Sequence, residues 1–192
     1  NPDRLIAQVE QASYEDAIRR RLRSEPVQYI TRQQEFYGLA LRVTTAVLIP
    51  RPETEHLVEA VLMHFRGRDA EPLRIADVGT GSGAIAIALA AHLPGAEIFA
   101  TDISPEALAV AKDNARAHEV AARIRFVKSD LLDIPIPGPG GLASGQFFDA
   151  VVSNPPYISL AESDELHPQV REHEPHMALF GGASGLDFYR RL

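Results

Sequence analysis

The feature that most constrains the fold is an alternation, between residues 73 and 153, of short β-branched runs with segments that carry apolar residues at helical spacing. Strands are expected at 73–78, 97–101, 124–128 and 148–153, and helices at 84–93 and 105–118. Strand, helix, strand, helix in this order predicts a parallel sheet of the doubly wound α/β type.

Smaller elements are expected before this alternation. A capping-box pattern at 13–16 predicts a short helix that ends at Arg23. Strand-like runs at 28–30, 39–43 and 47–49 predict a β-hairpin. After Arg51 a helix ending at Gly67 is expected, because apolar residues recur at helical spacing. Those residues are Leu57, Val58, Val61, Leu62 and Phe65, and a glycine- and proline-rich loop is expected later, at 134–145.

A glycine-rich loop joins the first strand of the alternation to its helix. Its residues are Gly79, Thr80, Gly81, Ser82 and Gly83. Glycines at this place let the backbone approach a ligand, and the helix amino terminus offers free N–H groups. The spacing also fits the dinucleotide fingerprint in its alanine variant, so a nicotinamide cofactor remains open at this point.

Three acidic residues follow strands near this loop. Asp77, two residues before the first glycine, suits a cationic ammonium group better than a pyrophosphate. Asp102, at the end of the second strand, is expected to accept hydrogen bonds from ribose hydroxyls rather than to be a plain turn residue. For Asp130, after the third strand, a ligand contact and ordinary loop chemistry are both open.

The fourth strand leads into Asn154, Pro155, Pro156 and Tyr157. The prolines restrict the backbone, so the carbonyls before them have defined directions. Asn154 adds a side-chain carbonyl, and the Tyr157 ring is available for packing. The turn therefore offers convergent acceptors for a planar –NH₂ group. The alternative is a tight turn in which Asn154 caps its own backbone.

Composition excludes several classes of protein. With 192 residues, 45% of them hydrophobic, the chain suits one globular domain, alone or with an appendage. A net charge of −7 argues against a surface that holds long nucleic acid. Without cysteine there are no disulfides or thiolate metal sites, and no apolar run approaches a membrane span, so a cytoplasmic location is expected. No metal site is expected; the histidines at 167, 173 and 176 are interpreted as surface residues.

The motifs together carry a family resemblance. The residues Asp77 to Gly83, Asp102, Asp130 and Asn154 to Tyr157, in that order and spacing, resemble those of class I S-adenosylmethionine-dependent methyltransferases that modify planar amino nitrogens. More narrowly, the chain is similar to protein-glutamine N5-methyltransferases that act on peptide-chain release factors. That similarity runs from about Arg19 to Leu192 and includes the segments 26–30, 35–38, 48–55 and 174–189.

The resemblance implies roles for single residues. The loop from Gly79 to Gly83 would line the methionine and ribose portion of S-adenosylmethionine, and Asp102 would hold the ribose hydroxyls. Asp130 and Leu131 would face the adenine, while Phe36, Arg51 and Pro52 would close over the methionine end. Asn154 and the Pro155 carbonyl would accept from the –NH₂ of a substrate glutamine, with Pro156 and Tyr157 beside its side chain.

The same resemblance implies a reaction and a partner. Methyl transfer to the glutamine of a Gly-Gly-Gln loop in a release factor is expected, without sequence-specific binding of nucleic acid. A ribosomal-protein glutamine or adenine N6 remains an alternative substrate, since adenine presents the same planar –NH₂. A catalytically silent cofactor-binding module is the alternative from another class.

The family pattern also predicts how the chain is divided. Residues 1–25 are expected to be the remnant of an amino-terminal helical domain that recognises the substrate, 26–50 a hairpin linker, and 51–192 the methyltransferase domain. The four strands are expected in the order three, two, one, four. Because a sheet of this class has seven strands, we expect a fragment that lacks both ends, with an unprotected edge at 148–153 and its last residues inside a helix.

Overall fold

The computed structural model describes residues 7–133 and 148–192. Its centre is a parallel sheet of four strands in the order β5-β4-β3-β6, which confirms the predicted fold class and strand order. The strands are β3 (Arg74–Val78), β4 (Glu97–Asp102), β5 (Ile124–Lys128) and β6 (Ala150–Ser153). The loop predicted at 134–145 lies outside the described residues.

The winding direction of the sheet reverses at β3. From β3 the chain moves outward through β4 to β5, and it returns on the other side of β3 as β6. In the register of the sheet, Val78 lies opposite Ser153 on one side and Thr101 on the other. The loops that follow β3, β4 and β6 therefore leave the same edge of the sheet side by side. Open α/β sheets bind ligands at such a reversal point.

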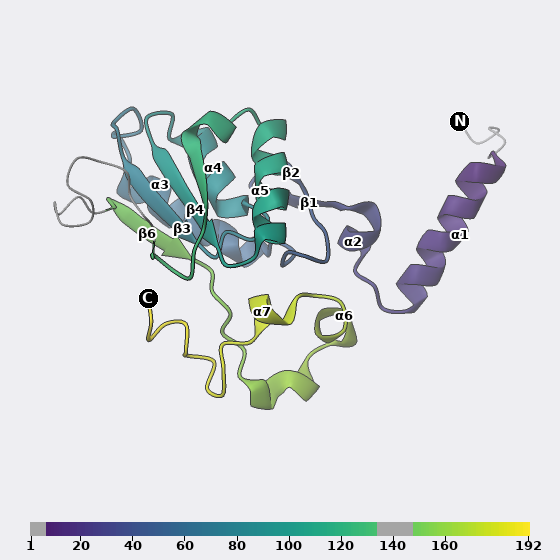
Figure 1. Ribbon diagram of the computed structural model, residues 1–192. Helices are drawn as coiled ribbons and strands as arrows, with labels where there is room; N and C mark the ends of the chain where they lie inside the picture. Colours follow the sequence, from purple (N-terminus) through teal and green to yellow (C-terminus); the bar gives the residue numbers. More distant parts are fainter. Residues whose placement is uncertain (1–6, 134–147) are drawn as a thin grey trace.

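Three helices pack together beside the sheet (Figure 1). They are α3 (Glu55–His64), α4 (Ala84–His92) and α5 (Pro105–Ala117), and α4 contacts both of the others. Seven consecutive residues of α4 are buried, which explains why its sequence is apolar all round. Helix α5 begins as predicted: Ser104 is its N-cap, and the Ser104 Oγ accepts from the backbone N–H of Ala107 at 3.1 Å.

The amino-terminal third differs from the sequence prediction. The first helix, α1 (Gln8–Leu22), begins earlier than expected, and residues 28–30 belong to a helix, α2 (Val27–Thr31), instead of a strand. The hairpin consists of β1 (Gln33–Phe36) and β2 (Leu39–Arg42) alone, and 47–49 form no strand. Short apolar runs do not distinguish a strand from a buried helical turn.

Tyr29 shows why the run at 28–30 is helical. The backbone N–H groups of Tyr29 and Ile30 both donate to the carbonyl of Pro26, which precedes α2. The turn points the Tyr29 ring into a small core formed with Val43, Val47, Ile49, Ala107 and Val110. There its hydroxyl donates to the carbonyl of Val47 at 2.6 Å. Tertiary burial of one aromatic side chain has overridden the local strand pattern.

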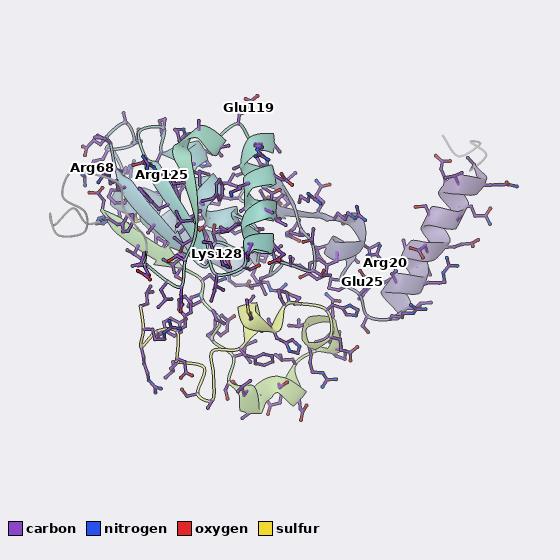
Figure 2. All side chains as sticks on the ribbon, in the orientation of Figure 1. Arg20, Glu25, Arg68, Glu119, Arg125 and Lys128 are labelled. Atoms are coloured by element: carbon purple, nitrogen blue, oxygen red, sulfur yellow. The ribbon has the colours of Figure 1, made fainter. Side chains whose placement is uncertain are left out.

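Helix α1 has no buried residue and extends away from the sheet (Figure 1). Its end is tied to the start of α2 by an ion pair of Arg20 with Glu25, in which two guanidinium nitrogens meet the two carboxylate oxygens (Figure 2). Charge-assisted pairs with this fork geometry are stronger than single contacts. The Arg20 guanidinium correspondingly lowers the pKa of Glu25.

The chain after β6 forms a separate layer across from the carboxyl edge of the sheet (Figure 1). It contains η4 (Leu160–Glu165), α6 (Pro168–Arg171) and α7 (His176–Leu179). The last residues, expected inside a helix, form consecutive turns at 187–191. Within the described part of the chain, β6 pairs with β3 alone, and the Val151 side chain is 43% exposed.

The main core lies between the sheet and the three helices. It includes Phe36, Phe65, Ile75, Ile87, Leu89 and Ile98, each no more than 1% exposed. Between residues 7–133 and 148–192, no helix has the length and apolar character needed to cross a membrane.

Asn114 of α5 joins the hairpin to the glycine loop. Its Oδ1 accepts from the backbone N–H of Arg42 at 2.8 Å, and its Nδ2 donates to the carbonyls of Arg42 and Ser82, both at 2.9 Å. The side chain is buried, so removing it leaves three backbone groups without partners.

We expect Asn114→Ala to lower the free energy of unfolding by about 2–3 kcal/mol, measured by urea denaturation. Asp113→Ala is the matched control, because Asp113 contacts the side chain of the same Arg42 in an exposed ion pair at 3.0 Å. It should cost less than about 1 kcal/mol. Equal losses in the two variants would contradict a structural role for Asn114.

Candidate functional site

A cavity of about 610 Å³ lies where the loops after β3, β4, β5 and β6 meet the carboxyl-terminal layer. This volume is within the range of sites for small molecules. From the sheet side it is lined by Gly79, Thr80, Gly81, Ser82, Asp102, Asp130, Leu131, Asn154, Pro155 and Pro156. These are ten of the residues that the sequence predicted for the site, so the fold brings most of the predicted set together.

The glycine loop presents open backbone to this cavity. The N–H groups of Gly79 and Thr80 donate to the carbonyl of Thr101 at 2.9 and 2.8 Å, which holds the loop on the end of β4. Gly79 and Gly81 have φ values of +72° and +56°, and a Cβ on either would meet no atom within 4 Å. Glycine is needed here for the left-handed backbone, while the space beside the loop stays free for a ligand.

Gly83 has a different role from the other two glycines. A Cβ at this position would come within 3.1 Å of the Ala111 Cβ and 3.0 Å of the Ile87 Cδ1. Gly83 does not line the cavity. It allows α4 and α5 to approach each other, and its predicted contact with the cofactor stays a prediction.

Asp102 holds the loops around the cavity with both carboxylate oxygens. Oδ2 accepts from the backbone N–H of Gly81, and Oδ1 accepts from that of Ser104, both at 2.9 Å. A carboxylate oxygen accepts more than one hydrogen bond. Asp102, at the cavity wall, therefore retains capacity for two neighbouring hydroxyl groups, as predicted for a ribose.

Asp77 lies behind the glycine loop and does not line the cavity. It is fully buried, and its Oδ2 accepts from the Thr80 Oγ1 at 2.6 Å and from the backbone N–H of Ala86 at 3.1 Å. No described residue donates to its Oδ1. Burial raises the pKa of Asp77 to about 6, although the bonds from Thr80 and Ala86 lower it. The structure thus places Asp77 as a support of the loop rather than in the cavity wall.

Asp130 and Leu131 lie at the opposite end of the cavity from Asn154 along the sheet edge. Leu131 has a φ of +61°, and its carbonyl accepts from the Thr101 Oγ1 at 3.2 Å. The Asp130 Oδ2 accepts from the Arg191 Nη2 at 2.6 Å. Arg191 and Phe188 also line the cavity. The last turns of the chain thus border the predicted adenine subsite.

Asn154 is oriented by a residue far away in the sequence. Its Nδ2 donates to the Oγ1 of Thr54 at 3.1 Å, and no described residue donates to its Oδ1. The alternative in which Asn154 caps its own backbone is therefore not what the structure shows. The side-chain carbonyl remains available as an acceptor at the cavity wall, next to Pro155.

The carboxyl-terminal layer supports the backbone of the Asn154 turn. Ile158 pairs with Phe180 in an isolated parallel bridge. A Cβ on Gly181 would come within 2.6 Å of the Pro156 carbonyl oxygen, and one on Gly185 would overlap the Tyr157 carbonyl oxygen. The two glycines are therefore needed for close backbone packing.

Besides Asp77 and Gly83, four more predicted site residues lie outside the cavity wall. Phe36 is 1% exposed and packs in the main core instead of closing over a ligand. Arg51 turns to Glu174, and Pro52 begins the short helix η1 (Pro52–Thr54). Tyr157 is 60% exposed. Phe36 is held by the core, and Arg51 by its ion pair with Glu174.

An ion pair between the partly exposed Arg51 and the buried Glu174 explains how the Arg51 segment reaches the site. The Arg51 Nη2 donates to the Glu174 Oε1 at 2.6 Å, and the Glu174 Oε2 accepts from the backbone N–H of Ile49 at 3.4 Å. The Glu174 side chain is fully buried. Burial of Tyr29 raises the pKa of its hydroxyl, and the nearby charge of Glu174 raises this pKa further. The pair joins the segment before α3 to the segment before α7.

Both of these segments contribute walls that sequence reasoning missed. They supply Ala46, Val47, Leu48, Pro50 and Thr54 from one side, and Pro175, His176, Met177 and Ala178 from the other. A sequence signal was present in Arg51 and Glu174, two opposite charges beside prolines, but their pairing depends on tertiary contact.

The three histidines make backbone contacts. His173 and His176 lie 3.0 Å from the carbonyls of Arg23 and Arg171, and the His167 Nδ1 accepts from the N–H of Gln169. Over residues 7–133 and 148–192, no three His, Asp or Glu side chains are grouped to hold a metal ion.

Comparison with protein families identifies two matching segments. The model described as methyltransferase domain matches residues 75–173, about half of the chain. The model described as PrmC N-terminal domain matches residues 1–31. The first match covers the strands, the glycine loop and the Asn154 turn; the second covers α1 and α2.

Curated relatives support the narrower resemblance. A release factor glutamine methyltransferase of Koribacter versatilis is 49% identical over 100% of this chain and 64% of its own length. The protein of the same name from Moorella thermoacetica is 47% identical over 98% of the chain and 65% of its own length. The chain thus spans about two thirds of the length of these relatives. The resemblance to release factor glutamine methyltransferases is confirmed.

A solved structure supports the fold. The catalytic domain of human METTL16, in complex with a MAT2A 3′UTR hairpin, superposes with a TM-score of 0.60 at 21% identity, over 81% of this chain and 55% of that one. At this identity the match concerns the fold alone.

The raised pKa of Asp77 predicts a pH dependence of stability. Between its unfolded value of 3.8 and its folded value of about 6, the folded chain retains a proton that the unfolded chain has lost. The resulting stabilisation is complete below the unfolded pKa and disappears as the pH rises through about 6. Asp77→Asn cannot titrate and retains an amide oxygen for the Thr80 bond.

We therefore expect the free energy of unfolding of the wild-type chain, relative to Asp77→Asn, to fall by on the order of 3 kcal/mol between pH 4 and pH 7. Urea denaturation of both proteins at several pH values measures this difference. Parallel pH profiles would show that Asp77 keeps an ordinary pKa in the fold.

Proposed function

We propose a function from one premise, which is that this chain belongs to the methyltransferase domain family. The reaction that the site supports best is transfer of a methyl group from S-adenosylmethionine to the side-chain amide nitrogen of a protein glutamine. The proposed glutamine is that of a Gly-Gly-Gln loop in a peptide-chain release factor. The observation that carries the proposal is the free Asn154 carbonyl beside the glycine-loop cavity.

The cavity residues fit this cofactor, and the family match favours it over a nicotinamide dinucleotide. Gly79 and Gly81 leave open space beside their backbone, and Asp102 offers paired acceptors for ribose hydroxyls. Asp130 and Leu131 border the end of the cavity that we assign to the adenine. When bound there, S-adenosylmethionine would supply an electrophilic methyl group on a positively charged sulfur. The family match favours this methyl donor.

The Asn154 turn would orient the nucleophile. An amide nitrogen is a weak nucleophile, because its lone pair is delocalised into the carbonyl group. Acceptance of its two N–H hydrogens by the Asn154 Oδ1 and the Pro155 carbonyl would hold the nitrogen in place and increase its electron density. Preorganised acceptors in a partly closed site stabilise the positive charge that develops on such a nitrogen.

The chain has no need of a strong general base in this scheme. The nitrogen gains positive character as it bonds to carbon, and its proton becomes acidic and can leave to water. Asp77, the acidic residue with a raised pKa, lies behind the loop and outside the cavity wall, so it is not placed to accept this proton.

The amino-terminal part belongs to a separate step of the proposal. Residues 1–31 match the PrmC N-terminal domain model, and α1 has no buried residue. We assign residues 1–25 to recognition of the protein substrate, 26–50 to a linker that contributes one cavity wall, and 51–192 to the methyltransferase domain.

The decisive experiment is mass spectrometry of release factors after incubation with the chain and S-adenosylmethionine. A gain of one methyl group on the glutamine of the Gly-Gly-Gln loop is expected. Ribosomal proteins and adenine-containing oligonucleotides, incubated in parallel, represent the two alternative substrates. Methylation of either of these without modification of the release factor would overturn the proposed substrate.

We expect Asp102→Ala to weaken the binding of S-adenosylmethionine by about 10- to 100-fold, because the paired acceptors for the ribose are lost. Titration calorimetry measures the dissociation constant. Asp113→Ala, which removes an exposed acid of α5 outside the cavity, should bind normally. Unchanged affinity in Asp102→Ala would remove Asp102 from the site.

Asn154→Ala should leave the affinity for S-adenosylmethionine nearly unchanged but lower turnover by roughly 10²–10³-fold, the loss typical of a preorganised polar group. Single-turnover rates with a Gly-Gly-Gln peptide report the chemical step directly. A nearly normal rate would show that Asn154 has only a structural role.

A further inference from the structure

We propose that the amino-terminal segment takes part in cofactor binding, because the Tyr29 hydroxyl of α2 holds the cavity wall at 46–50 in place. This inference rests on the proposed function and deepens it, since it adds a residue that determines the affinity for S-adenosylmethionine. Tyr29 does not line the cavity, so it is a positioning residue that acts through Val47. Residues 1–31, which match a different family model from residues 75–173, thus contribute to the same site.

The contact between Tyr29 and this wall has a defined direction. The Tyr29 hydroxyl lies 2.6 Å from the carbonyl oxygen of Val47, across 18 residues of sequence, and the bond is buried. A carbonyl oxygen can only accept, so the hydroxyl is the donor. Burial raises the pKa of Tyr29, which keeps the hydroxyl protonated. Val47 itself lines the cavity, so the bond joins α2 directly to the backbone of a wall residue.

The wall is held at two points that lie two residues apart. Tyr29 donates to the carbonyl of Val47, and the backbone N–H of Ile49 donates to the Glu174 Oε2 at 3.4 Å. Val47 and Ile49 belong to the small core and are 1% and 2% exposed. Leu48, between them, is half-buried and lines the cavity. The two bonds therefore hold the residues on either side of Leu48 and fix how far this wall extends into the cavity.

Tyr29 is itself held firmly enough to fix the wall. It is 3% exposed, and its backbone N–H donates to the carbonyl of Pro26 at 3.0 Å in the first turn of α2. Its ring belongs to the small core together with Ala107 and Val110 of α5. Ala107 also lines the cavity, so the small core and the cavity share a boundary.

Loss of the hydroxyl alone removes this support. In Tyr29→Phe the ring still fills the small core, but the Val47 carbonyl loses its donor. A buried carbonyl without a partner is unfavourable, so the segment moves until water or another donor reaches it. The wall is then less ordered, and part of the free energy of ligand binding is used to order it again. The affinity falls although no residue that contacts the ligand has changed its side chain.

The test compares Tyr29→Phe with two matched controls. Tyr37→Phe removes a hydroxyl from a tyrosine that packs against the main core, outside the cavity. Val110→Ala removes apolar volume from the same small core without changing the hydroxyl, and Val110 does not line the cavity. Titration calorimetry measures the affinity for S-adenosylmethionine, and urea denaturation measures the stability of each variant. Hydrogen exchange, followed in nitrogen-15 NMR spectra, measures the protection of the backbone N–H groups of Val47 and Ile49.

In Tyr29→Phe we expect the dissociation constant for S-adenosylmethionine to rise about tenfold, the effect of one lost hydrogen bond. The N–H groups of Val47 and Ile49 should exchange faster by a similar factor. Tyr37→Phe should change neither property. Val110→Ala should lose stability but keep its affinity within about threefold of the wild type. Unchanged affinity in Tyr29→Phe would overturn the proposal, and so would an equal loss in Val110→Ala, which would show that any loosening of the small core has the same effect.

Binding and exchange do not depend on turnover, so they separate this inference from the proposed function. A wild-type chain that binds S-adenosylmethionine but leaves a Gly-Gly-Gln peptide unmethylated, with weaker binding in Tyr29→Phe, would refute the proposed reaction and support the positioning role. Methylation of the peptide by both proteins with the same KM for S-adenosylmethionine would support the reaction and refute the positioning role. A wild-type chain without affinity for S-adenosylmethionine would overturn both.

Discussion

The parallel pairing of β3 with both β4 and β6 is the constraint on which the site depends. Because β3 has a hydrogen-bonded neighbour on each side, the glycine loop after it emerges between Asp102 and Asn154, although these residues are 52 positions apart in sequence. A parallel ladder also aligns the strand ends, so backbone donors, carboxylate and amide carbonyl meet at one edge. The carboxyl-terminal layer then closes this edge into a cavity.

That closure involves the ion pair of Arg51 with the buried Glu174. Removing the Glu174 charge from water is unfavourable, so the pair is weak support for stability, and its clearer effect is to hold two distant segments together. Here Glu174 is bonded to Arg51 and to the backbone of Ile49. The arrangement it specifies brings Thr54 to Asn154 and places Pro175 and its neighbours across the cavity.

The glycines divide into two physical classes that look alike in sequence. Gly79, Gly81, Gly83 and Gly185 all have a left-handed backbone. Gly79 and Gly81 lie beside open space, whereas Gly83, Gly181 and Gly185 permit close packing of helix or backbone. The first class defines where a ligand can lie. The second class holds the walls of the site in place, and a substitution there would act on ligand binding only through the fold.

The sequence by itself determined the sheet, its strand order and the cavity residues that follow strands. These features depend on hydrophobic periodicity, turn residues and chain direction, which are local properties that the folded structure retains. It also placed Asp102 and Asn154 correctly at the edge of the sheet. Only the tertiary structure decided that residues 28–30 form a helix, that Phe36 enters the core, that Arg51 turns to Glu174 and that Asp77 lies behind the loop. Each of these outcomes depends on a partner that is distant in sequence and contacts the residue through burial or charge pairing. Local sequence patterns do not indicate which distant partner a residue will contact.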